Sequence, residues 1–434
     1  MQKIIGLLQK EFVKNVLTLM TGTVLGQGIA LLLSPLITRL FSLEDFSAFE
    51  QYSFLLSVLS VIICGKYEYS IMQPKDQEDA RHLLALSIRI AFFASIGVGI
   101  VLLFTSGMIA DAYHSPSLRY LLWTLPVALF LAGTFNAINY WFSRKKNYRV
   151  AATSKLLYSA AGEPFKLAAG WIKPTPAGLI LSTVIGHLTA TWQSWFQLRR
   201  DEPRTIRHID RKRMMDLART YIRYPRFAIW GSILNTMAQW AHVAVFGFYY
   251  HEAALIPIAY IALSRRIFFN PLGIIANSYG QVFYQRIQQI DDGYALKKFY
   301  ITNLLRFCAF GACMVAVVYL LPNNSLGFVF GEKWTDALEY LKILCFWYAL
   351  NFAITSLSFI FNRLQLQHYT LVADAVHFVA VIAAFAIAYH TGMDAKGAVT
   401  AMVVTKVVYL SLNLVAIIYF LDRYAQQQKT RNTA

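Results

Sequence analysis

The sequence predicts an all-α integral membrane protein, with about twelve transmembrane helices in two six-helix lobes around a central cavity. Three observations lead to this fold class: an apolar composition, twelve long apolar runs, and an uneven distribution of basic residues between those runs. Of the 434 residues, 57% are hydrophobic and 15% are charged, whereas a soluble domain carries roughly 25% charged residues. This composition excludes a soluble enzyme.

Twelve apolar runs are long enough to span a membrane, because a helix needs roughly 20 mostly apolar residues to cross about 30 Å of hydrocarbon. They cover residues 15–41, 47–71, 82–104, 118–142, 150–172, 176–196, 227–250, 254–284, 299–321, 335–362, 369–390 and 397–421. The first run is much longer than the apolar region of a cleavable signal peptide, which has roughly 7 to 15 residues. We therefore expect it to remain as the first span.

Basic residues collect on one side of these spans. If the N-terminus is cytoplasmic, the seven inner segments contain 26 of the 40 Lys and Arg residues. The six outer loops then contain three, which are Lys173, Lys333 and Lys396. Positive charge marks the cytoplasmic side, and one missing or extra span would remove the asymmetry. The sequence therefore predicts an even number of spans and two cytoplasmic termini.

These boundaries divide the chain into five expected parts. They are an amphipathic cytoplasmic surface helix (1–14), an N-lobe (15–196), a basic cytoplasmic linker (197–226), a C-lobe (227–421) and a cytoplasmic tail (422–434). The first part mixes lysines with apolar residues, as helices on membrane surfaces do. The linker has ten basic and four acidic residues, so we expect it to be attracted to anionic lipid and not to nucleic acid.

Seventeen charged residues fall within the predicted spans, eleven of them basic and six acidic. Each would cost about 2.5 to 3.5 kcal/mol near the middle of the bilayer. Long side chains near a helix end avoid this cost by extending to the headgroups, and this is the alternative for Arg89 and Arg306. Four basic residues lie deeper within their spans: Lys155 is five residues from a predicted end, and Arg265, Arg266 and Lys406 are nine or more residues from one. These four must face a polar interior.

Polar residues within the spans recur at helical spacing, which places them on shared faces. The fifth span carries Lys155, Ser159, Glu163 and Lys166, and the second carries Glu50, Ser53, Ser57, Ser60, Cys64 and Glu68. Similar faces include Gln27 in the first span, Asn235 and Gln239 in the seventh, and Asn270 in the eighth. For serine and threonine, contacts between helices are an equally good explanation. The cations differ, because five would remain if every intramembrane acid paired with one, and this excess predicts an anionic ligand.

Two stretches near the N-terminus resemble a known family. TGTVLGQGIALLLSPLITRLFSLEDFSAFEQYSF (21–54) and GKYEYSIMQPKDQEDA (65–80) are similar to the opening helices of polysaccharide exporters, the lipid-linked oligosaccharide flippases of the multidrug/oligosaccharidyl-lipid/polysaccharide (MOP) superfamily. The resemblance implies a V-shaped fold of two six-helix lobes that opens alternately to each side. It also implies a bacterial inner-membrane protein that moves an undecaprenyl-pyrophosphate-linked oligosaccharide, such as an O-antigen unit, to the outer leaflet.

Under this resemblance the polar residues acquire expected roles. A diphosphate needs charge-assisted hydrogen bonds once it leaves water, and its expected ligands are Lys155, Arg265, Arg266, Lys406, Arg306 and Arg89. The glycan would meet Gln27, Asn235, Gln239 and Asn270. Coupling to a proton or sodium gradient would use Glu163, Asp374 or Glu68. We expect no cofactor and no metal; the expected partners are the lipid-linked oligosaccharide, membrane lipids, and a polymerase or chain-length regulator of polysaccharide assembly.

Two other classes of function stay open at this stage. A drug antiporter of the same superfamily would present acidic residues to cationic substrates, and the basic excess argues against it. A membrane enzyme or a scaffold of polysaccharide assembly is the second alternative. An enzyme usually needs a sizeable catalytic loop, whereas the longest outer loops, 105–117 and 322–334, have 13 residues each. There is no phosphate-binding Gly-rich loop, and the four cysteines have no disulfide or metal spacing, so we expect no enzyme.

Overall fold

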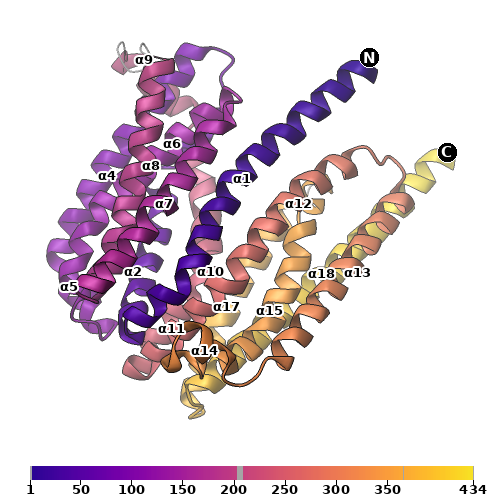
Figure 1. Cartoon of the computed structure of the whole chain (residues 1–434). Helices are drawn as coiled ribbons and strands as arrows, with labels where there is room; N and C mark the ends of the chain where they lie inside the picture. Colours follow the sequence, from indigo (N-terminus) through magenta and orange to yellow (C-terminus); the bar gives the residue numbers. More distant parts are fainter. Residues whose placement is uncertain (1, 203–208, 365, 434) are drawn as a thin grey trace. The chain divides into compact units, whose positions relative to one another are not determined.

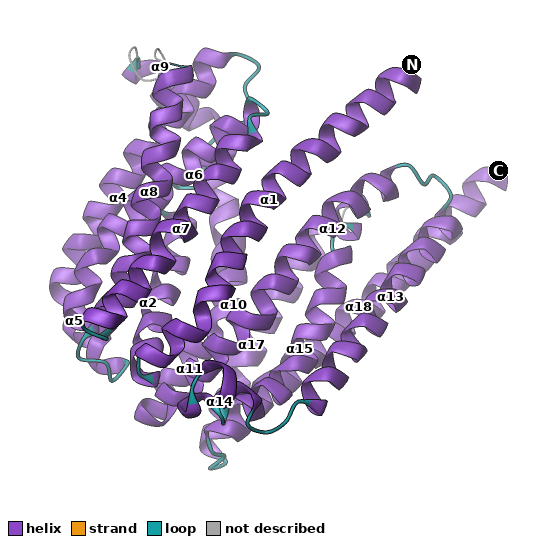
Figure 2. Cartoon of the chain, in the orientation of Figure 1, coloured by secondary structure: helices purple, strands orange, loops and turns teal. Residues whose placement is uncertain are grey.

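The computed structural model describes residues 2–202, 209–364 and 366–433 (Figure 1). Within these ranges the side chains of residues 2–20, 227, 281, 285, 362, 367, 368, 371 and 429–433 are not described. Every regular element in the described part of the chain is a helix (Figure 2). The predicted all-α class is therefore confirmed.

The first half of the chain forms six long helical segments joined by short connections. They are α1 (Gln2–Leu40), α2 (Leu43–Ile62) with the short α3 (Tyr67–Ser70), α4 (Gln77–Ala112), α5 (Leu118–Leu121) continuing into α6 (Leu125–Arg144), α7 (Tyr148–Ile172) and α8 (Pro176–Asp201). After them, α9 (Arg211–Thr220) lies in the predicted linker. The six segments coincide with the first six predicted spans.

The second half forms six further long segments. They are α10 (Ile229–Tyr250), α11 (Leu255–Ser264) continuing into α12 (Asn270–Gln288), α13 (Gly293–Leu320), α15 (Ala337–Leu357), α17 (Gln367–His390) and α18 (Ala395–Thr433), with the short α14 (Ser325–Phe330) and α16 (Ile360–Arg363). The twelve long segments of the described residues agree with the expected number of spans.

Eight stretches of the described residues are long and apolar enough to cross a membrane by composition alone. One of them, Ile229–Gln288, contains both α10 and the α11–α12 segment. The helices α2, α7 and α8 are outside these eight because their polar residues lower the mean hydropathy. All three belong to the first half of the chain.

The chain divides into two compact units, Met1–Ala244 and Val245–Ala434, called here the N-terminal unit and the C-terminal unit. The division falls inside α10, shortly after the expected linker of residues 197–226. The expected lobes, 15–196 and 227–421, and the tail, 422–434, remain predictions. So does the surface helix of residues 1–14: its backbone is part of the continuous α1, but its side chains are outside those described.

The predicted second span is interrupted, which is a correction to the sequence analysis. Helix α2 ends at Ile62, and the chain turns through Gly65 and Lys66, both with a left-handed backbone (φ 60° and 61°). Glycine adopts this conformation without a steric cost, so Gly65 permits the turn. The expectation that Glu68 shares one helix face with Glu50 is therefore wrong, because Glu68 lies in α3 beyond the turn.

Helix α9 in the linker packs on the N-terminal unit. The Arg213 guanidinium donates two hydrogen bonds of 2.8 Å to the carboxylate of Asp79 at the start of α4. His82 of α4 accepts a hydrogen bond of 3.1 Å from the backbone N–H of Asp210, and Met214 and Leu217 are buried against the unit's core. The second half of the linker is thus a folded part of this unit.

Helices α1 and α7 approach each other closely in the N-terminal unit. A Cβ atom added to Gly22 of α1 would lie 2.2 Å from the backbone oxygen of Ala152 in α7. Small residues at such crossings let two membrane helices pack backbone to backbone. The same contact brings Lys155 of α7 beside α1, as described below.

We expect Gly22→Ala to destabilise the protein by about 1 to 3 kcal/mol, the usual cost of overpacking a close contact. The matched control is Gly28→Ala on the same helix, where an added Cβ would meet no atom within 4 Å. Thermal unfolding of both variants in detergent measures the difference. Equal melting temperatures for Gly22→Ala and Gly28→Ala would contradict the close α1–α7 contact.

Candidate functional site

Two buried cations lie close together in the C-terminal unit. Lys406, in α18, is only 1% exposed, and its Nζ lies 3.8 Å from the centroid of the Trp347 ring of α15. A cation over an aromatic face is held by the negative potential of the ring. Arg265 is also buried, and its positive charge acts on Lys406. Two of the predicted diphosphate ligands therefore lie within electrostatic range of each other.

A wide helical turn positions the arginines. Residues Arg265–Phe269 form a π-helical turn between α11 and α12, and Pro271 follows at the start of α12. Proline has no backbone N–H, so a carbonyl one turn earlier loses its helical donor, and the wider turn accommodates this loss. Such turns occur frequently at functional sites. The guanidinium carbon (Cζ) of Arg265 lies 5.9 Å from the centroid of the Phe269 ring. Arg266 is half-buried.

An acidic and aromatic group adjoins these cations. The Tyr409 hydroxyl of α18 donates a hydrogen bond of 2.8 Å to the Asp374 carboxylate of α17. The His377 ring stacks on the Tyr409 ring, with centroids 4.0 Å apart and planes 6° apart, and the charge of Lys406 acts on His377. We call this set the C-terminal charge centre: Arg265, Trp347, Asp374, His377, Lys406 and Tyr409.

The sequence predicts only part of this centre. It indicates Arg265 and Lys406 by their depth in the spans, and Asp374 as a candidate for ion coupling under the family resemblance. It did not select Trp347 or Tyr409, because an aromatic residue in an apolar run is usually a core residue. Their partners on other helices reveal their roles, and the only sequence signal is that Tyr409 follows Lys406 by three residues, on the same helix face.

The predicted charged residues of the N-terminal unit have partners within that unit. Lys155 is half-buried, and its Nζ donates a hydrogen bond of 3.5 Å to the Thr23 hydroxyl of α1. Glu163 and Lys166 are buried and form an ion pair of 2.9 Å within α7. The pair confirms that these two polar residues of the fifth span share one face.

The remaining predicted charges lie elsewhere in their units. Arg89 of α4 points to α9, where its guanidinium lies 3.3 Å from the Met214 sulfur. Glu68 is buried in α3. Arg306 is exposed on α13, and its charge acts on the Tyr279 hydroxyl of α12. Their expected roles in binding or coupling remain predictions.

The four amide residues predicted to meet the glycan are accessible on their helices. Asn235, Gln239 and Asn270 are exposed, and Gln27 is half-buried. Gln239 donates a hydrogen bond of 2.6 Å to the Asn235 side chain. Asn270 begins α12 directly after the π-helical turn. An amide group is costly to place against lipid. The exposed positions of these residues therefore fit a space filled with water or ligand.

A polar pocket of about 330 Å³ lies within the N-terminal unit, between α2, α6, α7 and α8. Its polar lining consists of Ser53, Ser57, Ser60, Asn136, Thr183 and His187. The three serines belong to the polar face predicted for the second span. The contributions from α6 and α8 were missed, since single polar residues in apolar runs show no pattern.

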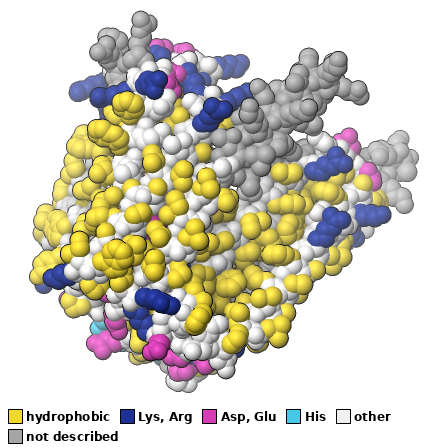
Figure 3. Space-filling view, viewed as in Figure 1, with side chains coloured by type: hydrophobic (Ala, Val, Ile, Leu, Met, Phe, Trp, Pro, Cys, Tyr) yellow, Lys and Arg dark blue, Asp and Glu magenta, His cyan; other side chains and the backbone are white. Residues whose placement is uncertain are grey.

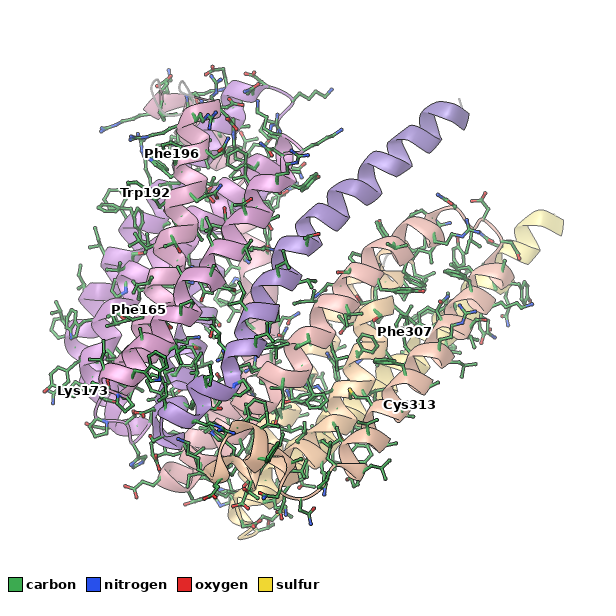
Figure 4. All side chains as sticks on the ribbon, in the orientation of Figure 1. Phe165, Lys173, Trp192, Phe196, Phe307 and Cys313 are labelled. Carbon is green, nitrogen blue, oxygen red and sulfur yellow. The ribbon has the colours of Figure 1, made fainter. Side chains whose placement is uncertain are left out.

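Helix α8 separates this pocket from the outer surface of the unit. Thr183 and His187 line the pocket, whereas Trp192 and Phe196 project from the helix (Figure 4) and are 72% and 60% exposed. The face of the unit shown in Figure 3 is covered mainly by apolar side chains, with Lys and Arg gathered near one end. Such a surface suits lipid contact.

The described residues contain no group of three His, Cys, Asp or Glu side chains that could hold a metal ion. The four cysteines are free thiols; Cys64 and Cys345 are buried, and Cys308 and Cys313 are exposed.

A family model described as "Polysaccharide biosynthesis protein" matches residues 36–339, which is more than half of the chain. The chain belongs to this family. The matched range includes α2 to α8, the linker and the segment with Arg265 and Arg266. No curated protein matches the chain.

Solved transporter structures share the fold of this polysaccharide biosynthesis protein. A lipid II flippase, MurJ, in an inward closed conformation is 13% identical with a TM-score of 0.70, covering 93% of this chain and 90% of its own. An inward-facing multidrug resistance MATE family transporter of the MOP superfamily is 13% identical with a TM-score of 0.67, covering 95% and 96%. A MOP superfamily transporter from Pyrococcus furiosus is 13% identical with a TM-score of 0.54, covering 94% and 96%. The predicted MOP-type fold is confirmed.

We expect Lys406→Met to keep or raise the thermal stability of the protein. A lysine near the middle of the bilayer costs about 2.5 to 3.5 kcal/mol on insertion scales, and methionine fills a similar volume without the charge. The measurement is the melting temperature in detergent, with Leu410→Ala on the same helix as a control that removes apolar packing. A larger loss of stability in Lys406→Met than in Leu410→Ala would show that Lys406 is structural and would contradict a ligand-binding role.

Proposed function

We propose that the protein is a flippase that moves an undecaprenyl-pyrophosphate-linked oligosaccharide, an O-antigen or similar surface polysaccharide unit, from the inner to the outer leaflet. Transport would follow alternating access of the MOP-type fold, in the bacterial inner membrane with both termini cytoplasmic. The observation that carries the proposal is the buried pair of cations, Arg265 and Lys406, in a member of the polysaccharide biosynthesis protein family.

The depth of this pair supports an anionic substrate. Lys406 lies eleven residues after Ala395, the first residue of α18, which corresponds to about 16 Å along the helix and to the middle of a bilayer of about 30 Å. A cation at this depth costs about 2.5 to 3.5 kcal/mol on insertion scales. A diphosphate offsets this cost, because charge-assisted hydrogen bonds are about twice as strong as neutral ones.

The structural neighbours support a role that depends on the charge of the binding region. One neighbour is named a lipid II flippase. The Pyrococcus furiosus transporter is described by the reverse polarity of its binding pocket, which suggests a different function for that protein. In the present chain we assign the diphosphate to Lys155, Arg265, Arg266 and Lys406, with Arg306 and Arg89 as further candidates along its route.

The glycan would use uncharged groups, and the lipid tail would stay in the bilayer. Gln27, Asn235, Gln239 and Asn270 offer amide donors and acceptors for sugar hydroxyls. Partners in this proposal are the lipid-linked oligosaccharide, membrane lipids, and the polymerase or chain-length regulator that uses the product.

We assign ion coupling to the C-terminal charge centre in preference to Glu163 or Glu68. Asp374 is hydrogen-bonded to Tyr409, and Tyr409 stacks on His377, which lies within the field of Lys406. A proton or sodium ion at Asp374 and a diphosphate at Lys406 would therefore influence each other through Tyr409 and His377. This arrangement gives a physical route from an ion gradient to binding and release of the substrate.

The test is leaflet exchange in proteoliposomes with fluorescent undecaprenyl-pyrophosphate oligosaccharide. We expect Lys406→Met to slow exchange roughly tenfold or more, because a hydrogen bond to a charged group contributes about 1.5 to 3 kcal/mol. The matched control is Lys342→Met, which removes a half-buried lysine of α15 whose Nζ lies 3.2 Å from the Asn323 Oδ1 atom. This control should stay within about twofold of the native rate.

Two outcomes would contradict the flippase proposal, and a third would contradict only the role of Lys406. Exchange by the native chain at the rate of empty liposomes would exclude a flippase. Export of cationic drugs by the same proteoliposomes, without exchange of the lipid, would favour the drug antiporter. Native exchange that Lys406→Met leaves unchanged would remove Lys406 from the proposed site.

A further inference from the structure

We infer that the pocket between α2, α6, α7 and α8 is a saccharide subsite that holds one or two uncharged sugar rings of the transported glycan. The inference rests on the proposed function and deepens it, since it assigns part of the substrate to the N-terminal unit.

The pocket lies at the depth of the hydrocarbon core. Tyr158 is ten residues from the start of α7, and His187 is eleven residues from the start of α8, which places each about 15 to 16 Å along its helix. Polar side chains at this depth are costly against lipid. Six polar residues from three helices around one pocket therefore indicate a polar ligand or water within it.

The lining carries no fully charged side chain. Serine, threonine and asparagine supply its polar atoms, and none of the lining residues is Asp, Glu, Lys or Arg. The nearby charges, Glu163 and Lys166, neutralise each other in an ion pair. A diphosphate or an organic cation would thus find no counter-charge in the lining, whereas sugar hydroxyls both donate and accept hydrogen bonds and match hydroxyl and amide groups.

Aromatic rings complete the chemistry of a sugar site. Phe49, Phe135 and Tyr158 line the same pocket, and flat apolar faces of this kind pack against the C–H face of a sugar ring. Pockets for small molecules combine apolar and aromatic walls with a few polar groups that fix orientation. The volume of about 330 Å³ lies near the lower end of the range for such pockets, roughly 300 to 1,000 Å³.

His187 supplies an independent sign of a ligand. Its ring contacts the Tyr158 ring edge to face, with centroids 4.9 Å apart. The His187 Nδ1 atom is buried and has no hydrogen-bond partner among the described residues. Because buried polar atoms in native structures are nearly always hydrogen-bonded, this atom is suited to a sugar hydroxyl in the pocket.

The test measures protection of the pocket from a thiol reagent. Ser57→Cys is made together with Cys308→Ser and Cys313→Ser, and its labelling by methanethiosulfonate ethylammonium is timed. The probes are the undecaprenyl-pyrophosphate oligosaccharide extracted from host membranes and sugar-free undecaprenyl pyrophosphate. We expect the oligosaccharide lipid to slow labelling roughly fivefold or more, and the sugar-free lipid to leave the rate within about twofold. In the native chain, labelling of the exposed Cys313 on α13 (Figure 4) should respond to neither lipid.

A second pair of variants tests the proposed contact between Ser57 and the sugar by its effect on the rate of transport. Ser57→Val should slow exchange of the oligosaccharide lipid roughly fivefold, whereas Ser95→Val, at a buried serine of α4 outside the pocket lining, should stay within about twofold.

The outcomes separate this inference from the proposed function. Equal protection by both lipids, or protection by neither while native exchange is intact, would overturn the saccharide subsite and leave the flippase in place. Absence of native exchange would overturn the flippase itself. Exchange that is equally slow in Ser57→Val and Ser95→Val would show a packing effect and would also count against the subsite.

Discussion

The free-energy cost of placing charged and polar groups in hydrocarbon determines where such groups can lie in this protein. Twelve helical segments satisfy their backbone hydrogen bonds internally, as a bilayer requires, and apolar side chains cover their outer faces. Lys406, eleven residues after the start of α18, lies over the face of the Trp347 ring, which stabilises its charge. Arg265 acts on it with a second positive charge, and two like charges within electrostatic range of each other favour an anion.

The two units carry different chemistry. The C-terminal unit contains the charge centre, where cations, a carboxylate, a histidine and two aromatic residues adjoin a π-helical turn. The N-terminal unit contains a pocket with hydroxyl, amide and aromatic lining and no charged lining residue. A lipid-linked oligosaccharide has the same division, with a charged diphosphate beside an uncharged glycan. Each site thus matches one chemical part of the proposed substrate.

The sequence predicted the features that depend on composition and helical period. The twelve spans, the depth of Lys155, Arg265 and Lys406, and the serine face of α2 all follow from spacing along one helix. It could not predict the features that depend on contacts between helices. Trp347 and Tyr409 acquire their roles from Lys406 and Asp374 on neighbouring helices, and the left-handed turn at Gly65 and Lys66 interrupts a run whose hydropathy is continuous. The pocket could not be predicted from the sequence, because α6 and α8 each contribute only one or two polar residues to its lining.

The most direct measurement of the central claim is Trp347 fluorescence during titration with undecaprenyl pyrophosphate. The Lys406 ammonium lies 3.8 Å from the Trp347 ring centroid, so an anion bound to that ammonium must change the emission of the ring. The account predicts a saturable change with undecaprenyl pyrophosphate that is lost in Trp347→Phe and in Lys406→Met, and no change with undecaprenol. An identical response to undecaprenol, or a response that persists in Trp347→Phe, would contradict the binding of a diphosphate at the C-terminal charge centre.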